Sequence, residues 1–512
     1  MKKLLILFVT LFSALFIISA CSSSDRESSD SAQPKDLVAG FAAEPITLDP
    51  HDANDSVSNQ ANLLIYDKLI TFDEDNNLVP ELATDWTFSE DGMALTLTLR
   101  EDVTFHDGTP FNAEAVKANF ERIIDEDNNL ARMSIYADYM ENIEVDNEYQ
   151  VTINFHKPFG AALATLAHGA GGIVSPKAIE EGQDIGTNPA GTGPYKLVEW
   201  TPGTEMNLEP NENYWGDDPQ LDSISLRVIP EDSSRSIALE NGEIDVASPL
   251  SIQDIERLQE NEDIEVTHNP IYRNLQLILN FDNPLFQDKK VRQALNYAVD
   301  KETIVQSILK DMGEVATAPI GSSLNGYSEI GTYEYEPEKA KELLEEAGVE
   351  PGTKIKLWTS EAAYIMDSTI AQFIQQNLTE VGFDVEFQVF EYSSYLDVLE
   401  DPDPDFDIIV GSWGASTGDV DWGLRPTLTS EGSNNYGGYS NDEVDELVLA
   451  GLNSSDMDER VDIYHEAMQI IHEDAPWVFL LEYSNPIAVR SEVKNVYNWG
   501  NGYVVLRNAF IE

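Results

Sequence analysis

Apolar and polar residues alternate along short stretches of this chain, and elsewhere the apolar residues recur at the spacing of a helix. Alternation with a period of two predicts half-buried strands at 95–100 and 150–155. Between them, the apolar residues of 113–125 recur at three- and four-residue intervals, and Asn112 precedes them as a candidate N-cap. The first part of the chain therefore contains both strands and amphipathic helices.

The same mixture continues in the second half of the sequence. Amphipathic helices are predicted at 289–305, 337–347, 367–381 and 456–471, two of them followed by glycine. Strands are predicted among them at 354–358, 384–389 and 406–410. Because strands and helices alternate, we expect an α/β fold with mixed or parallel sheets and helices on their faces.

The residues that follow the predicted strand 406–410 are rich in glycine and in polar and aromatic side chains. The glycines allow irregular backbone, so we expect the strand to end there in a turn. The turn carries the indoles of Trp413 and Trp422, the carboxylates of Asp419 and Asp421, and hydroxyls that include those of Ser416 and Thr417. Such groups can hold a polar organic molecule with a positively charged end. An ordinary surface turn has a similar composition, so this alternative stays open.

The N-terminus is typical of an exported lipoprotein. Lys2 and Lys3 precede an apolar run at 4–18, which as a helix reaches about 22 Å, short of the ~30 Å of a bilayer core. Residues 1–20 therefore read as a signal peptide. The run ends in Ala20-Cys21, which resembles a bacterial lipobox, and implies cleavage after Ala20 and acylation of the only cysteine, Cys21, with palmitate among the possible chains.

Residues 21–34 are rich in Ser and Asp, have no apolar periodicity and are predicted to be a flexible tether. The chain from Lys35 onward is too long for one ordinary core, so two or more lobes are expected. With 93 acidic and 30 basic residues the formal net charge is −63, which disfavours nucleic acid and acidic lipid as partners. We interpret this halophilic or alkaliphilic composition as an adaptation to a salty or alkaline exterior, although any solvated acidic surface has it.

The sequence lacks a persuasive catalytic or cofactor motif. It has no G-x-S-x-G, P-loop or H-E-x-x-H, and 191–194 lacks the further glycine of a dinucleotide fingerprint. His465 and His472 lie seven residues apart on a predicted helix, about 10 Å, which is too far for one metal without a third group. We therefore predict no enzyme activity, no cofactor and no metal site, while a carboxylate-based site stays possible.

Several segments, in order along the chain, resemble the solute-binding proteins of ABC importers in the peptide and nickel group, bacterial extracellular solute-binding protein family 5. The segments are TLDP at 47–50, PELA at 80–83, LREDVTFHDGTPFNAEAV at 99–116, GTGPY at 191–195, NYW at 213–215, VRQALNYAVDK at 291–301 and AKELLEEAG at 340–348. The lipobox-like N-terminus also fits this resemblance, because Gram-positive members of the family are lipoproteins tethered to the membrane.

Within this family the chain resembles glutathione-binding proteins most. The likeness rests on 413–422, on 49–55 and on Arg273 before the strand 275–280. Dipeptide binders have an arginine on the helix matching 367–381, and nickel binders have one near 166–173; neither segment contains an arginine here.

The resemblance implies a class II periplasmic-binding-protein-like fold with two lobes, mixed sheets and a hinge. Lobe I would comprise 35–270 and 485–512, with an extra subdomain at about 52–189, and lobe II would comprise 271–484. The chain would cross between the lobes near 269–281 and 483–490. Ligand would bind between the lobes and be buried when they close.

Burying a peptide zwitterion requires a partner for each of its charges. The resemblance assigns the ligand ammonium to Asp419, with Asp421 beside it or acting as a helix cap. Arg273 and Arg132 are candidates for the ligand carboxylates because a guanidinium binds them with two hydrogen bonds; Arg132 can also be an ordinary surface residue. The pocket walls are predicted to be Trp413 and Trp422, unless these pack in the core.

Asn54, Asp55, Ser416 and Thr417 are predicted as further polar contacts of the ligand. The implied function is that of a monomeric, lipid-anchored binding protein on the outer face of the cytoplasmic membrane of a Gram-positive bacterium. It would deliver glutathione or a short peptide to an ABC permease and its ATPase. Alternatives are binding of other dipeptides or oligopeptides, binding of nickel, a role as a peptide receptor in signalling and, less in keeping with the sequence, a secreted hydrolase.

Overall fold

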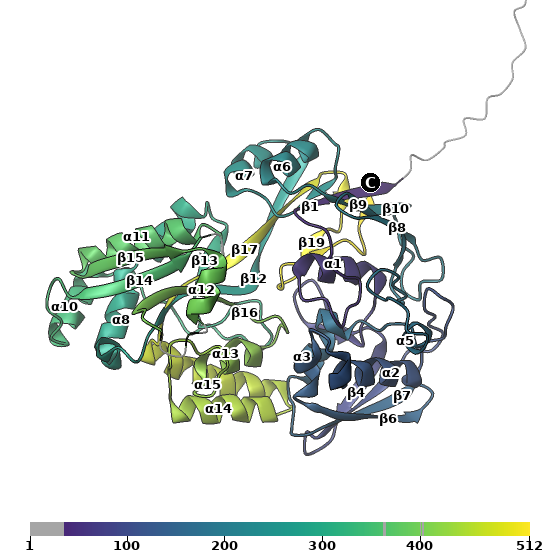
Figure 1. The fold of residues 1–512 in the computed structure, drawn as a ribbon, viewed down its shortest axis with the longest axis horizontal. Helices are drawn as coiled ribbons and strands as arrows, with labels where there is room; N and C mark the ends of the chain where they lie inside the picture. Colours follow the sequence, from purple (N-terminus) through teal and green to yellow (C-terminus); the bar gives the residue numbers. More distant parts are fainter. Residues whose placement is uncertain (1–34, 362–364, 400, 402–403) are drawn as a thin grey trace, which may run out of the picture. The chain divides into compact units, whose positions relative to one another are not determined.

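An eleven-stranded mixed sheet joins elements from both halves of the sequence (Figure 1). The computed structural model describes residues 35–361, 365–399, 401 and 404–512. The predicted signal peptide, Cys21 and the tether lie outside the described residues. The strand order is β15-β14-β16-β12-β17-β11-β1-β10-β9-β8, with β13 paired to β17. Both parallel and antiparallel pairs occur, which confirms the predicted mixed α/β architecture.

The strands of this sheet are β1 (Asp36–Phe41), β8 (Tyr195–Thr201), β9 (Glu205–Pro210), β10 (Ser223–Val228), β11 (Val246–Ala247), β12 (Ile264–Leu279), β13 (Gly313–Val315), β14 (Lys354–Ser360), β15 (Asp384–Phe390), β16 (Ile408–Gly414) and β17 (Trp477–Arg490). The two longest, β12 and β17, pair antiparallel with each other, and their register shifts between Pro270 and Asn274. On its other side β12 pairs with β16, which places Arg273 opposite Gly414.

A separate antiparallel sheet of four strands has the order β4-β5-β7-β6. It consists of β4 (Ala83–Phe88), β5 (Ala94–Leu99), β6 (Met140–Asn147) and β7 (Gln150–Phe155). Helix α2 (Ala113–Ile124) packs on it through Val116, Phe120 and Ile123, which are buried in one apolar core with Val151 and Ile153. A hairpin of β2 (Ile70–Phe72) and β3 (Leu78–Pro80) contributes to the same core.

The structure also contains further α-helices and short strands. The helices are α1 (Ser56–Ile65), α3 (Met133–Ala137), α4 (Ala162–Ala167), α5 (Pro176–Glu180), α6 (Asp232–Glu240), α7 (Ile252–Gln259), α8 (Lys289–Ala298), α9 (Lys301–Thr303), α10 (Pro337–Glu346), α11 (Asp367–Glu380), α12 (Tyr392–Leu399), α13 (Val420–Leu428), α14 (Asp442–Asn453) and α15 (Met457–Asp474). Two short strand pairs near the C-terminus are β18 (Val493–Lys494) with β21 (Phe510–Ile511), and β19 (Tyr497–Asn498) with β20 (Val504–Val505).

Most of the predicted elements are confirmed, but one strand is displaced and one helix is interrupted. The helix at 113–125 is α2, and the side chain of Asn112 caps it as predicted. The predicted helix at 289–305 is interrupted, because Val299 is extended and the side chain of Asp300 caps a new helix, α9. The strand predicted at 406–410 runs from Ile408 to Gly414, because β12 pairs with it along its whole length.

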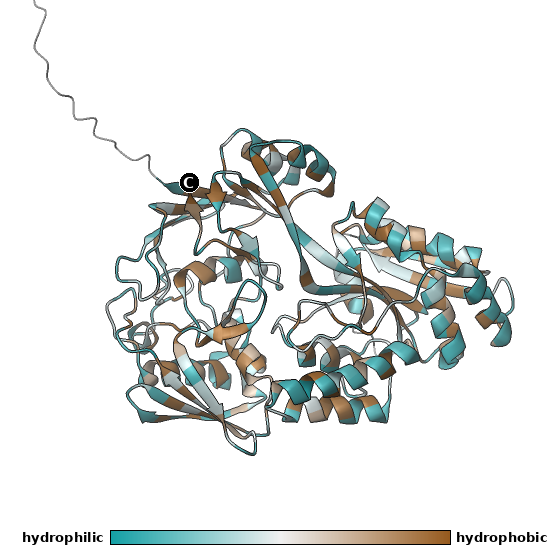
Figure 2. Ribbon diagram, turned by 180° about the vertical axis from the view of Figure 1, so that it is seen from behind, coloured by the Kyte–Doolittle hydropathy of each residue, from teal (hydrophilic) through white to brown (hydrophobic). Residues whose placement is uncertain are grey.

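Several helices bury one face and expose the other, whereas α4 is buried along its whole length. Hydrophilic and hydrophobic residues are interspersed along them (Figure 2), as expected for helices that cover a sheet. In α15, for example, Tyr464, Met468 and Ile471 are buried at helical spacing. Within the described ranges, none of the helices is both long and apolar enough to cross a bilayer.

Candidate functional site

The loop between β16 and α13 is held in one conformation by backbone hydrogen bonds. Gly418 has φ +73° and donates its N–H to Ala415 O at 2.8 Å, closing a tight turn. Asn325 then binds both sides of it, donating to Gly418 O and accepting from Val420 N, each at 2.9 Å. A Cβ on Gly418 would lie 2.7 Å from a ring carbon of Phe72, so only glycine fits this position without a shift. These contacts therefore fix the conformation of the loop.

Asp419 is buried and its carboxylate is fully engaged by the protein. Arg460 donates to both of its oxygens, at 3.0 and 2.7 Å, and one of these oxygens also accepts from Asp421 N. That last bond makes Asp419 the N-cap of α13. The exposed fractions of the Asp419 and Arg460 side chains are 1% and 2%. Because Arg460 already balances its charge, this geometry does not favour the predicted contact between Asp419 and a ligand ammonium.

Asp421 lies inside α13, so the alternative that it caps this helix is wrong; Asp419 is the cap. The guanidinium of Arg425 donates to both oxygens of Asp421, at 3.2 and 2.9 Å, and Tyr464 donates a longer hydrogen bond of 3.4 Å. Burial raises the pKa of Asp421, and Arg425 opposes this shift. Asp421 therefore holds Arg425 in place.

The two predicted tryptophans lie together. The indole N–H of Trp413 donates to the backbone oxygen of Trp422 at 2.7 Å, and both side chains are half-buried. The Arg425 guanidinium lies 5.5 Å from the ring centre of Trp422 and 5.7 Å from that of Tyr139, which belongs to the core of the four-stranded sheet. This cluster thus joins α13 to the earlier part of the chain. In the same loop, Ser416 is half-buried and Thr417 is buried.

Arg273 is exposed on β12, beside the same loop. One of its terminal nitrogens donates to Ser412 Oγ at 3.3 Å. Its cross-strand partner is Gly414, and a Cβ there would lie 2.9 Å from an Arg273 terminal nitrogen. Because Gly414 has no side chain, the Arg273 guanidinium can lie close to it on the surface of the paired strands.

Arg132 and Asp55 lie on a second set of elements, around the start of α1. Arg132 Nε donates to Ala53 O at 2.8 Å. Asp55 caps α1 by accepting from Ser58 N at 2.8 Å, and its other carboxylate oxygen is buried without a hydrogen-bond partner among the described residues. Asn54 is exposed. In the described part of the chain, no hydrogen bond or ion pair joins this set directly to Arg273 or to residues 413–422.

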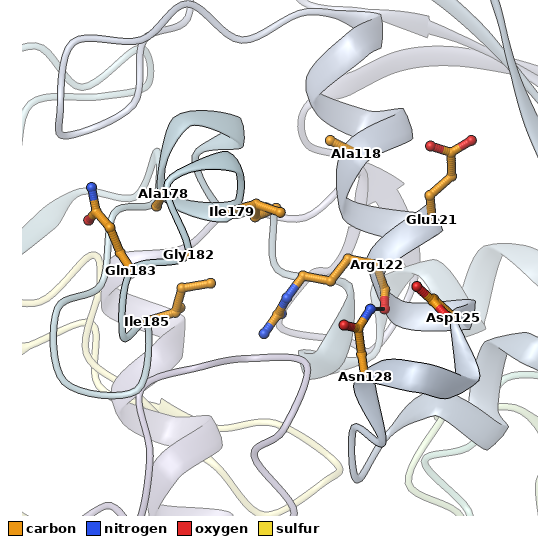
Figure 3. A pocket seen from close by; sticks show the side chains of 10 residues that line it. All are labelled: Ala118, Glu121, Arg122, Asp125, Asn128, Ala178, Ile179, Gly182, Gln183 and Ile185. Atoms are coloured by element: carbon orange, nitrogen blue, oxygen red, sulfur yellow. Dashed lines mark hydrogen bonds between the residues drawn. The ribbon is translucent and has the colours of Figure 1, made fainter.

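The loop that carries Asp55 is anchored to α2. Arg122 on α2 forms a two-pronged ion pair with Asp49 and also bonds His51 Nδ1, whose other ring nitrogen bonds Gly172 O. Burial, with Arg122 adding to it, lowers the pKa of His51 to about 4, so the imidazole is neutral. Figure 3 shows Arg122 at the wall of a surface cavity of about 500 Å³ between α2 and the segment around α5. Because Asp49 neutralises Arg122, this cavity offers no free cation.

Arg132 and Arg273 are among the few arginines of the described chain that lack a carboxylate partner. The ion-paired arginines of the described chain are Arg122, Arg227, Arg235, Arg257, Arg425, Arg460, Arg490 and Arg507. Without a carboxylate partner in the described chain are Arg100, Arg132, Arg273 and Arg292. Of these, Arg100 donates to Glu81 O and lies over the ring of Trp215. Arg292 donates to backbone oxygens of Phe286 and Asp474 and lies over the ring of Phe281. Arg132 and Arg273 make one side-chain hydrogen bond each.

The two histidines of α15 are not a metal pair. His472 stacks between Tyr333 and Phe479, at ring-centre distances of 4.5 and 5.6 Å, whereas His465 contacts Gln469 on the surface. No group of three or more metal-binding side chains occurs among the described residues.

Sequence reasoning did not identify several residues that surround Asp55 and Trp413. Asn59, His168 and Tyr503 lie near Arg132 or Asp55, and Asn274 lines a small cavity beside Trp413. Their positions are far apart in the sequence, and no motif marks them. Of these residues, Asn274 alone has a recognisable sequence signal, because it is a polar residue in the largely apolar run of β12.

Comparison with known proteins identifies the family. Residues 77–435 match the bacterial extracellular solute-binding proteins, family 5. The chain is 33% identical over 456 residues to a glutathione-binding protein of Salmonella typhi, covering 87% of this chain and 89% of that one. It superposes on HbpA2 of Haemophilus parasuis with a TM-score of 0.85 at 24% identity, covering 93% and 100% of the two chains.

A further solved structure is more similar in sequence but less so in shape. The periplasmic binding protein DppA of Helicobacter pylori, in complex with the peptide STSA, has 27% identity and a TM-score of 0.73, covering 93% of this chain and 98% of that chain. The family match spans more than half of the sequence, and it agrees with the fold and with the motifs spread along the chain. The protein therefore belongs to the bacterial extracellular solute-binding proteins of family 5.

Proposed function

We propose that the protein is the extracytoplasmic solute-binding component of an ABC importer for glutathione or short peptides. The family membership and the 33% identity to a glutathione-binding protein support this class of function. The observation that carries the ligand assignment is the state of Arg132 and Arg273, which have no carboxylate partner in the described chain. Arg100 and Arg292 also lack a carboxylate partner, but each lies over an aromatic ring, whereas in the described chain Arg132 and Arg273 have no such ring contact.

The two guanidinium groups suit a ligand that carries carboxylates. A guanidinium can form two parallel hydrogen bonds with a carboxylate, and such charge-assisted bonds are about twice as strong as neutral ones. Trp413 and Trp422 would supply apolar walls near Arg273, and Ser416, Thr417 and Asn54 are proposed polar contacts. Asp421 would act through Arg425, and Asp419 would hold the loop through Arg460.

Capture would occur by closure of two lobes. We assign 35–270 and 485–512 to lobe I, with a subdomain at about 52–189, and 271–484 to lobe II. Contacts between the subdomain and lobe II would form on closure: Arg425 with Tyr139, and Gly160 N with Leu452 O at 2.7 Å. The paired strands β12 and β17 would bend at the register shift near Pro270. Ligand shifts this equilibrium only if it binds the closed form more tightly.

The alternative functions differ in the ligand that is bound or in the partner protein that receives it. Other dipeptides or oligopeptides would use the same arginines. A nickel complex would need ligand groups of its own, because no group of three or more metal-binding side chains occurs in the described ranges. A signalling receptor would bind the same ligand and contact a partner other than a permease. A secreted hydrolase would need a nucleophile in contact with a base.

The location follows from the N-terminal residues, which lie outside the described structure. We propose that signal cleavage exposes Cys21, that acyl chains including palmitate are attached there, and that the protein is held as a monomer at the outer face of the cytoplasmic membrane of a Gram-positive bacterium. We also propose that the net charge of −63 suits a salty or alkaline exterior.

Calorimetric titration of the full-length protein tests the ligand assignment. We expect reduced glutathione to bind, and Arg273→Gln and Arg132→Gln each to weaken binding at least tenfold, which corresponds to about 1.4 kcal/mol. Arg227→Gln, which removes a surface arginine paired with Glu205, is the matched control and should bind like the wild type. Heat from a dipeptide or tetrapeptide mixture or from nickel, without heat from glutathione, would assign a different ligand.

A further inference from the structure

A polar cluster at the start of α1 contains opposite charges that do not pair with each other. We call it the Asp55 cluster; its members are Asp55, Asn59, Arg132, His168 and Tyr503. Asp55 Oδ1 accepts from Ser58 N, while Asp55 Oδ2 is buried with no hydrogen-bond partner among the described residues. Asn59 is 1% exposed and donates to Asp55 O at 2.7 Å, and its own side-chain oxygen also has no such partner.

Arg132 is fixed beside this acidic group by its backbone neighbours. Its N–H donates to His51 O, and Nε donates to Ala53 O, which Asn59 Nδ2 also contacts at 3.4 Å. The other guanidinium nitrogens make no hydrogen bond within the described chain. Arg132 and Asp55 therefore converge on the segment 53–55, yet no ion pair joins them.

The charges of Arg132 and Asp55 both act on Tyr503, and the charge of Arg132 also acts on His168. Burial raises the pKa of the Tyr503 hydroxyl to about 12, Arg132 opposes that shift and Asp55 adds to it. Burial, with Arg132 adding to it, lowers the pKa of His168 to about 3, so His168 is neutral. A buried carboxylate oxygen that lacks a donor is costly, and it accepts most strongly from a cationic N–H.

We propose that Asp55 and Arg132 together bind one free α-amino acid group of the ligand, the ammonium on Asp55 Oδ2 and the carboxylate on the terminal nitrogens of Arg132. This deepens the proposed function and rests on it. An ordinary peptide carries these charges at its opposite ends, whereas a ligand linked through a side-chain carboxyl carries both on one carbon. The chemical class is thus a γ-glutamyl peptide, whose distal carboxylate remains available for Arg273.

The other two candidate carboxylates, Asp419 and Asp421, are already paired with arginines, which favours Asp55 as the partner of the ligand ammonium. Both oxygens of Asp419 accept from Arg460, and both oxygens of Asp421 accept from Arg425. Asp55 has an oxygen that is buried and accepts no hydrogen bond within the described chain. A ligand ammonium would therefore displace no existing ion pair at Asp55.

Two isomeric ligands provide the sharpest test on the full-length protein. Glutathione and its isomer with an ordinary α-linked glutamate have the same atoms and charges, and differ only in the carboxyl group that forms the peptide bond. We expect the α-linked isomer to bind at least tenfold more weakly by calorimetry, because its free carboxylate and its ammonium are no longer on one carbon. Equal affinities would overturn the proposal.

Variants of the aspartates test the residue assignment. Asp55→Asn keeps an N-cap for α1 but removes the charge, and should weaken glutathione binding at least tenfold. Asp52→Asn is the matched control: Asp52 is exposed, accepts from Ala131 N in the same loop, and should leave affinity unchanged. Wild-type affinity in Asp55→Asn would overturn the inference while leaving the proposed function intact. A wild type that binds neither isomer nor any peptide mixture would overturn both.

Discussion

At the scale of single residues, the protein contains arginines of two kinds. Arg460 is buried and satisfied by Asp419, by Gly451 O and by the ring of Tyr464. Arg273 is exposed, and within the described part of the chain its side chain bonds only Ser412. Both are isolated arginines in an acidic sequence, and neighbouring residues do not tell them apart. Their partners come from other elements, so only the folded chain separates the structural arginine from the candidate ligand-binding one.

Removal of the buried arginine should destabilise the protein strongly. Arg460→Met leaves the Asp419 carboxylate buried without its cation, so we expect the free energy of unfolding to fall by about 3–5 kcal/mol. Urea unfolding followed by circular dichroism measures this change. Lys341→Met, which breaks an exposed pair with Glu338, is the control and should cost less than about 1 kcal/mol. A loss that small in Arg460→Met would contradict the expectation.

Lys301 should make stability depend on alkaline pH. Its ammonium is buried and donates to the backbone oxygens of Asn296 and Tyr333, at 2.8 and 2.7 Å. Burial lowers its pKa from 10.5 to about 7, and the charges of Glu334 and Asp300 only partly oppose this shift. Between these two pH values the unfolded chain holds the proton that the folded protein has released, so the free energy of unfolding contributed by Lys301 rises with pH there.

The measurement compares variants across that pH range. We expect the stability of the wild type, relative to Lys301→Met, to increase from pH 7 to 10, as followed by urea unfolding at each pH. Lys341→Met, which removes an exposed lysine, serves as the control and should run parallel to the wild type. A constant difference between wild type and Lys301→Met would show that the buried lysine does not change its protonation on folding.

At the scale of elements, local patterns predicted helices better than strand ends. Helix α2 begins after Asn112 as predicted, because a cap and an apolar stripe are local in sequence. Strand β16 extends to Gly414, past its apolar run, because residues 273–279 of β12 pair with it. Glycine alone predicts a turn, but a long partner strand can keep glycine residues extended. This extension places Gly414 against Arg273.

Gly414→Ala should therefore reduce ligand affinity with little effect on stability. The new Cβ would lie 2.9 Å from a terminal nitrogen of Arg273, and this flexible side chain can move away. We expect glutathione binding to weaken severalfold in calorimetry, while the free energy of unfolding changes by less than about 1 kcal/mol. In an Arg273→Gln background the same substitution should have no further effect on binding. An equal effect in both backgrounds would rule out action through Arg273.

At the scale of the whole molecule, the net charge of −63 opposes folding through self-repulsion. Salt shortens the screening length from about 10 Å at 0.1 M to about 3 Å at 1 M. We expect the melting temperature to rise over this range with sodium chloride. Calorimetric melting measures it, and potassium chloride distinguishes screening, which is the same for both salts, from specific sodium binding. A melting temperature that did not rise would count against adaptation to a salty exterior.

The sequence by itself determined the α/β class, most helices and the family, and it suggested residue types for a candidate ligand site. These follow from local periodicity, capping residues and motifs, which are properties of short segments. Only the tertiary structure decided that Arg460 neutralises Asp419, that Gly414 makes room for Arg273, and that Asp55 and Arg132 converge around 53–55. The physical reason is that burial and ion pairing depend on side chains from distant elements, and these decide which charges are left for a ligand.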